Sequence, residues 1–169
     1  MATPTDLAAA EAAIRARLVA IVESVDGISA QVHDYWRNVQ NEAVRSALLK
    51  DSVSGSLHFW FVSLAFDSTL TQERDGTLSK NTLVYDLHSY YAVSDASQSE
   101  KLFAVKVLDV VTALNLAQKL RLASDELAFP VIRDSGPVQL LEFNQVEFTN
   151  VLCHHARIQV PVVFSGGDC

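Results

Sequence analysis

Cys153, His154 and His155 form the densest group of metal-ligating residue types in the sequence. A structural zinc ion needs about four nitrogen, sulfur or oxygen ligands that converge on one point. The three residues lie in a segment with the alternation of a β-strand, where His154 points away from both neighbours. They cannot converge without a bulge, and the other histidines are scattered at positions 33, 58 and 88. We therefore expect surface or half-buried histidines, with no metal and no other cofactor.

A cysteine nucleophile is the second chemistry that these residues suggest, but no activating motif surrounds Cys153. The sequence has no nucleophile elbow, H-E-x-x-H metalloprotease motif or phosphate-binding P-loop. Gly76, Gly166 and Gly167 are typical of turns or tails. We therefore expect a protein that is not an enzyme. A small-ligand-binding or enzymatic α+β domain is the alternative from a different class, and it would need convergent polar residues in an apolar pocket.

The polar segment Asp67–Ser79 is the candidate functional segment of the chain. Its thirteen residues are long for a hairpin connection, and loops beyond about 12 residues are usually functional or disordered. A solvated connection is the simpler interpretation, and contact with a neighbouring subunit is the one that we favour. We predict a firmly held base and a mobile tip that assembly orders. The candidate assembly residues are Asp67, Thr71, Glu73, Arg74, Asp75 and Lys80.

Long strands are predicted on both sides of this segment, over Leu57–Phe66 and Lys80–Tyr91. In the second strand one face is apolar and the other carries charge, which predicts a sheet with one covered and one wetter face. Trp60 alternates with Phe59 and Phe61, so one of these sets must leave the helix-covered face. An aromatic side chain on the other face indicates a second covering layer or a subunit contact.

The segments before these strands predict a helix, a strand and a second helix. Alanine-rich sequence with an apolar stripe predicts a helix that begins near Thr5 and ends near Gly27. Loose alternation over Ile28–Trp36 predicts a short strand, at an edge of the sheet because Asp34 interrupts its apolar row. Asn38–Lys50 has the pattern of another helix.

The segments after the long strands predict a buried helix. Ser94–Ser97 offers an N-cap. The residues that follow are apolar over a wide arc, and we expect Leu108, Val111 and Leu114 to pack on the sheet.

A closing hairpin is predicted from Val138–Phe148 and Val151–Phe164, with its turn at Thr149–Asn150. Pro161 should lie at an edge or near the strand's end, because proline cannot donate to a β-ladder. Residues 165–169 are expected to form a flexible tail.

Together these elements predict an α+β fold with the order α-β-α-β-β-α-β-β. The expected sheet is mainly antiparallel, has about four to five strands and is covered by helices. The length of 169 residues fits a single domain, residues 1–169.

Composition narrows the function classes. The formal net charge of -7 gives no basic surface for gripping phosphates, which argues against sequence-specific binding of nucleic acid. Two cysteines cannot form a disulfide framework, and a reducing compartment suits them. The sequence shows neither the layout of a signal peptide nor an apolar run of about 18 residues, so no membrane association is expected.

Three segments resemble the tail terminator proteins (tail completion or neck proteins) of long-tailed bacteriophages. The first runs from Ala12 through Asp26–Gly27 to Tyr35. The second is Leu83–Tyr91, which continues into Asp95 and the buried helix. The third is Val151–Ile158. Together the three segments span most of the chain.

The resemblance implies a structural virion protein, assembled in the host cytoplasm, that forms a ring, typically a hexamer, on the upper end of the tail tube. Such a ring ends tube polymerisation and joins the tail to the head connector, or stopper, protein. Genomic DNA would pass through its lumen without specific binding, which suits an acidic chain. A head–tail connector of the same neck is the alternative within this class.

Overall fold

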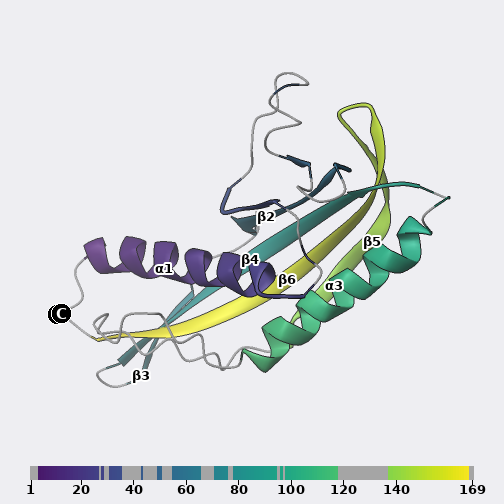
Figure 1. The fold of residues 1–169 in the computed structure, drawn as a ribbon. Helices are drawn as coiled ribbons and strands as arrows, with labels where there is room; N and C mark the ends of the chain where they lie inside the picture. The colour runs from purple at the N-terminus through teal and green to yellow at the C-terminus, as the bar shows by residue number, and fades with distance from the viewer. Residues whose placement is uncertain are drawn as a thin grey trace.

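The computed structural model describes residues 4–26, 28, 31–35, 43, 49–50, 55–65, 71–75, 78–94, 96, 98–117 and 137–167. Two long helices and a twisted sheet make up this part of the chain (Figure 1). The elements are α1 (Pro4–Glu23), β1 (Gln31–His33), β2 (His58–Leu64), β3 (Thr71–Asp75), β4 (Leu78–Ala92), α3 (Ser99–Leu116), β5 (Gln139–Phe148) and β6 (Val151–Gly167).

Within the described residues the sheet has six strands. Five follow the order β1-β2-β4-β6-β5, and β3 pairs with the free side of β4. Only β1 and β2 run parallel, so the fold is α+β with a mostly antiparallel sheet, as predicted. The strand β3 takes the sheet beyond the expected four to five strands. The central pair is β4 and β6, whose register runs from Leu78 opposite Gly167 to Ala92 opposite Cys153.

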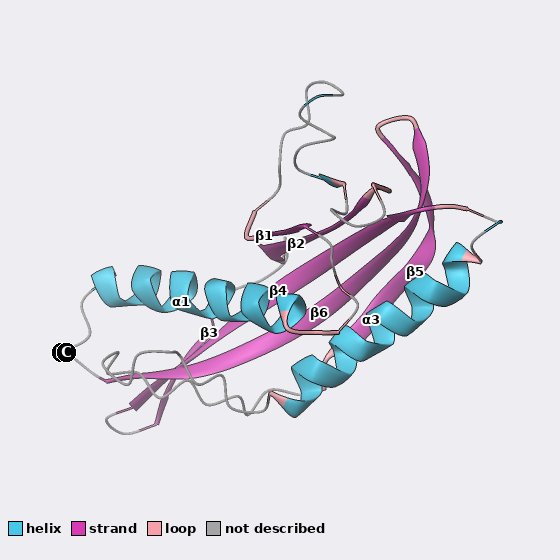
Figure 2. Ribbon diagram, in the orientation of Figure 1, coloured by secondary structure: helices cyan, strands magenta, loops and turns pink. Residues whose placement is uncertain are grey.

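Both helices cover the same face of the sheet (Figure 2). Leu18 of α1 and Val107 of α3 meet Trp60, Tyr85 and other strand side chains in one buried cluster. Burial of large apolar side chains of this kind contributes about 1.5–3 kcal/mol each. The packing of apolar stripes on the sheet therefore holds the two layers together.

The opposite face of the sheet has its own cluster. Phe59 and Phe61 are fully buried there together with Leu49 and Tyr90, whereas Trp60 lies under the helices. The aromatic rings of Phe59 and Tyr90 stack at a centroid distance of 4.9 Å. The predicted departure of one aromatic set from the helix-covered face is confirmed, and residues such as Leu49 supply a second covering layer.

The closing hairpin turns where the sequence predicts. Thr149 and Asn150 have φ values of 49° and 64°, as both central residues of a type I′ turn require. Pro161 lies well inside β6, which continues to Gly167, but β5 pairs with β6 only as far as Gln159. Among the described residues no strand pairs with that side of β6 at Pro161, so Pro161 lies on an edge stretch there, one of the two predicted positions.

The prediction for the buried face of α3 is partly wrong. Leu114 is buried as expected, but Leu108 is 57% exposed, and Val107 and Val110 face the sheet instead. The helix carries apolar residues on all sides, so periodicity alone does not fix which side faces inward.

The predicted N-cap of α3 is also wrong. Gln98 is the N-cap, in a left-handed conformation and without a side-chain capping bond. The Ser94 backbone N–H donates instead to the Ser99 hydroxyl oxygen at 2.8 Å, so a side chain inside the helix ties down the preceding turn.

The expected flexible tail over residues 165–169 is wrong for its first three residues. Ser165, Gly166 and Gly167 extend β6 and pair with Lys80, Ser79 and Leu78. Residues 168–169 lie outside the described part, as does most of the helix predicted over Asn38–Lys50. The short strand β1 is confirmed at an edge of the sheet.

Candidate functional site

The candidate assembly segment is a hairpin strand over much of its length. Thr71–Asp75 forms β3, which pairs with β4 so that Glu73 lies opposite Lys80. The loop predicted over Asp67–Ser79 is therefore wrong for residues 71–75 and 78–79, which are paired strand, whereas Asp67 and residues 76–77 lie outside the described residues. An edge strand needs backbone partners and no apolar alternation, which is why a purely polar pattern concealed it.

The hairpin projects from one end of the sheet. β2 pairs with β4 from Tyr85 to Tyr91, whereas β3 pairs with β4 from Leu78 to Thr82. Register therefore places β3 at the opposite end of the sheet from the β5–β6 turn, as Figure 1 shows. Five of the six candidate residues, all but Asp67, lie in this projecting hairpin.

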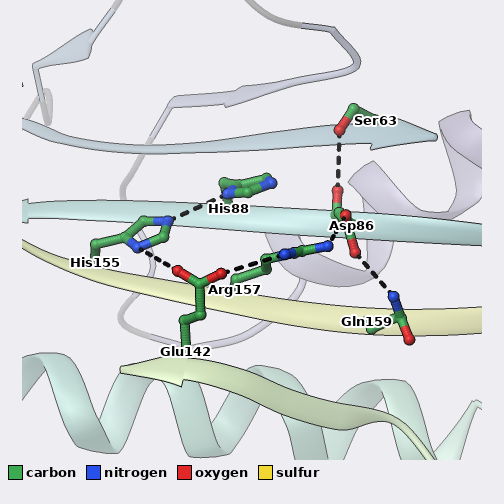
Figure 3. Close-up of polar contacts among 7 residues, drawn as sticks. All are labelled: Ser63, Asp86, His88, Glu142, His155, Arg157 and Gln159. Atoms are coloured by element: carbon green, nitrogen blue, oxygen red, sulfur yellow. Dashed lines mark hydrogen bonds and ion pairs between the residues drawn. The ribbon is translucent and has the colours of Figure 1, made fainter. Parts of the chain in front are cut away.

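A charged network crosses three strands on the face away from the helices (Figure 3). Arg157 of β6 donates to Asp86 of β4 at 2.8 Å and to Glu142 of β5 at 3.2 Å. Asp86 is almost fully buried, and the amide of Gln159 also donates to it at 3.5 Å. The guanidinium is therefore shared between two carboxylates, and this contact holds neighbouring strands in register.

Two histidines continue this network. Nδ1 of His155 lies 3.2 Å from the Asn144 side-chain oxygen and 3.7 Å from a Glu142 carboxylate oxygen. Because those oxygens accept, His155 Nδ1 donates and its Nε2 accepts from His88 Nδ1, at 3.2 Å. Burial, with His155 close by, lowers the pKa of His88 to about 4, and burial also lowers the pKa of His155. Both rings are therefore neutral at pH 7.

The hydrogen bonds of the network run mainly among its own members. The two carboxylates share Arg157, His88 donates to His155, and His155 donates to Asn144. A general base needs a free lone pair within about 3 Å of a substrate proton, and an anion site needs a free cation. The ring of Tyr90 packs beside this group, with its centroid 4.7 Å from that of His155. The arrangement suits a cross-strand clamp.

A serine–histidine pair lies on the helix-covered face. The Ser99 hydroxyl oxygen is 2.9 Å from Nε2 of His154, and both side chains are about 97% buried. The same hydroxyl oxygen accepts the Ser94 N–H at 2.8 Å, so Ser99 contacts both the preceding turn and β6. The adjoining pocket holds about 150 Å³, below the ~300 Å³ of usual ligand pockets. The pair anchors the start of α3 to β6.

The cluster Cys153–His154–His155 does not converge, as the alternation predicts. His154 faces α3, whereas Cys153 and His155 face the other side of the sheet. Among the described residues no three His, Cys, Asp or Glu side chains are arranged to hold a metal ion.

Large apolar side chains remain exposed on the outer side of α3. Leu102, Val105, Leu108 and Leu116 are 46–79% exposed, although they belong to a helix whose other side is fully buried. Exposed side chains of this size are the main apolar feature on the outer side of α3. No helix in the described ranges has the length and hydropathy to cross a membrane.

Sequence reasoning missed the charged network because its members come from three separate segments. Alternation within each strand indicates only the face on which Asp86 or Arg157 lies. Their partnership depends on the β4–β6 register, in which Asp86 lies opposite Gln159 and His88 opposite Arg157. A charge in the middle of a buried strand is the one feature that points to such a partner.

Comparison with known proteins assigns this chain to no family. No family model and no curated protein matches it. Among solved structures 16 chains match. One of them, whose title states no function, is 16% identical, with a TM-score of 0.43 over 91% of this chain and 90% of that chain.

Proposed function

We propose that this chain is the subunit of a ring that caps the tail tube of a long-tailed bacteriophage or a similar particle. The ring ends tube polymerisation and joins the tail to the head connector. This role makes the chain a structural protein of the virion neck, with the tube protein, the connector and further copies of itself as partners.

The observation that carries the proposal is the exposed apolar side of α3. Leu102, Val105 and Leu108 are each about half exposed in the single chain. Large apolar side chains exposed together on the outer side of a core helix are typical of a contact surface, so we infer that the isolated chain leaves an assembly contact uncovered.

The tail itself enters through the resemblance of three sequence segments to tail terminators, and the charge of the chain supports it. A formal charge of -7 per subunit gives the whole ring a net negative charge, which repels DNA and disfavours adhesion. The projecting β3–β4 hairpin, with Glu73, Arg74 and Asp75, contacts the tube or the next layer.

The test is co-expression of this chain with the tube protein of the same particle, followed by electron microscopy and native mass measurement. We expect rings at one end of each tube and a narrow distribution of tube lengths. Tubes that grow without limit and carry none of this chain at their ends contradict the proposal. Binding only to the head-side connector complex assigns the chain to the connector layer instead.

A further inference from the structure

The two helices of this chain have outward faces of complementary size. On α3 the face away from the core carries Leu102, Val105, Leu108 and Leu116, together with the polar residues Lys101, Asp109 and Thr112. These side chains stand out from the helix as large knobs. Leu102, Val105 and Leu108 are three residues apart and so are neighbours on the helix surface, and with Leu116 they form a strip that Asp109 and Thr112 interrupt.

The outward face of α1 is apolar as well, but it is built from small residues. Ala8, Ala9, Ala12 and Ala16 are exposed along it, and Glu23 is its exposed charge near the C-terminal end. Small side chains let a second helix approach to the usual 8–10 Å, and large side chains opposite them fill the space between. The α1 face is therefore shaped to receive the α3 face.

Within one chain these two faces do not cover each other. α1 and α3 lie on the same side of the sheet and share its core, so each helix turns its inner face to the strands and its outer face away (Figure 2). Where the helices meet inside the chain, partly buried residues of both, such as Val19 and Ala113, pack against the common core. Inside one chain, α3 therefore already packs beside α1 through these partly buried residues.

We propose that the outward face of α3 packs on the outward face of α1 of a second copy of this chain. The inference rests on the proposed ring, and it names the surfaces that join neighbouring subunits. Each subunit gives its α3 to one neighbour and its α1 to the other, the head-to-tail pattern that closes a ring. The exposed leucines and valine of α3 are covered once the ring is complete.

The experiment uses cysteine pairs and a bismaleimide linker in the full chain with Cys169→Ser. Val105→Cys and Ala12→Cys are made in separate chains and mixed. We expect a covalent dimer in the mixture and none with either chain alone. When both cysteines are in one chain, we expect a ladder of products that extends beyond the dimer.

The other outcomes show whether the α1–α3 contact or the proposed ring is wrong. A ladder that stops at the dimer keeps the contact and overturns the ring. Dimers from Val105→Cys alone overturn the proposed contact, because α3 then meets α3. Native assemblies without any α1–α3 product also overturn the contact and leave the ring standing. A chain that stays monomeric at the highest soluble concentration overturns the contact.

A second variant tests the same contact without a linker. Val105→Lys puts a charge in the strip, and we expect at least a tenfold weaker self-association by sedimentation. Gln139→Lys on β5 is the matched control, since it adds the same charge at another exposed position. Equal self-association of both variants and the natural chain overturns the inference.

Discussion

At the scale of single residues, the cross-strand network divides into a permanently charged part and a neutral part. Arg157 is charged at every accessible pH, and its hydrogen bond to Asp86 raises its pKa further. His88 and His155 are held neutral by burial. The clamp between β4, β5 and β6 therefore keeps one charge pattern across the neutral range, and acid is the condition that disturbs it.

The first prediction concerns the pH dependence of stability. The ordinary pKa of histidine is about 6.5, and the pKa of His88 in the fold is about 4. Between these values the unfolded chain binds more protons than the folded one, so stability falls as the pH drops from about 6.5 to about 4. Asp86, Glu142, Arg157 and His155 face this histidine and set the size of the effect.

The measurement is urea unfolding of the natural chain and of His88→Gln at several pH values. Glutamine cannot take up a proton, so we expect the variant to lose less free energy of unfolding across the same interval. Parallel curves for the two proteins would show that His88 titrates alike in the folded and unfolded chains.

At the scale of elements, α3 offers two leucines that differ only in the side of the helix on which they lie. We predict that Leu114→Ala lowers the free energy of unfolding by about 2–5 kcal/mol, because its side chain is 98% buried in the core. Leu108→Ala should change it by no more than about 0.5 kcal/mol, as expected of an exposed position in the monomer.

Chemical denaturation at a concentration where the chain is monomeric compares these two variants directly. Equal losses for Leu114→Ala and Leu108→Ala would mean that the apolar strip on the outer side of α3 is already covered within one chain.

The elements show which features the sequence pattern can predict. The faces of β2, β4 and β6 follow from alternation with period two, so Trp60, Asp86 and His154 lie on the predicted sides. The inner side of α3 does not follow, because large apolar residues surround the helix. The strand β3 was missed because its residues are all polar, and Ser165–Gly167 because Gly-Gly is typical of a tail.

The candidate site was predictable only in part, for a related reason. The polar segment around Glu73 was identified from composition, but its conformation depends on pairing with the start of β4. The Asp86–Arg157–Glu142 network depends on the register of three strands that are far apart in the sequence. Pairing over such distances leaves no trace within a short window of sequence.

At the scale of the whole molecule, the projecting hairpin can be tested without loss of the fold. Shortening it would delete β3, so exchange of its charges is the sharper experiment. Glu73→Lys combined with Lys80→Glu keeps opposite charges at partner positions and leaves the net charge unchanged. We predict an unchanged melting temperature and an unchanged mass of the assembly.

Binding to tube ends should fall at least tenfold in this double variant, because a partner surface now faces inverted charges. Sedimentation with preformed tubes measures the change, and Arg74→Lys, which keeps its charge, is the matched control. Normal capping by the double variant would mean that the hairpin makes no charged contact with the tube.

Pro161 affects how the edge of β6 can pair with a strand from another molecule. It lies opposite Val84, whose carbonyl accepts from the Ala65 N–H on the β2 side. In an antiparallel pair both backbone groups of a residue point the same way, so the backbone nitrogen of Pro161 points outward, beyond the last β5 partner at Gln159. A strand from another molecule that pairs there finds no N–H donor at Pro161. Pro161 therefore weakens pairing of this stretch of β6 with a strand from another molecule.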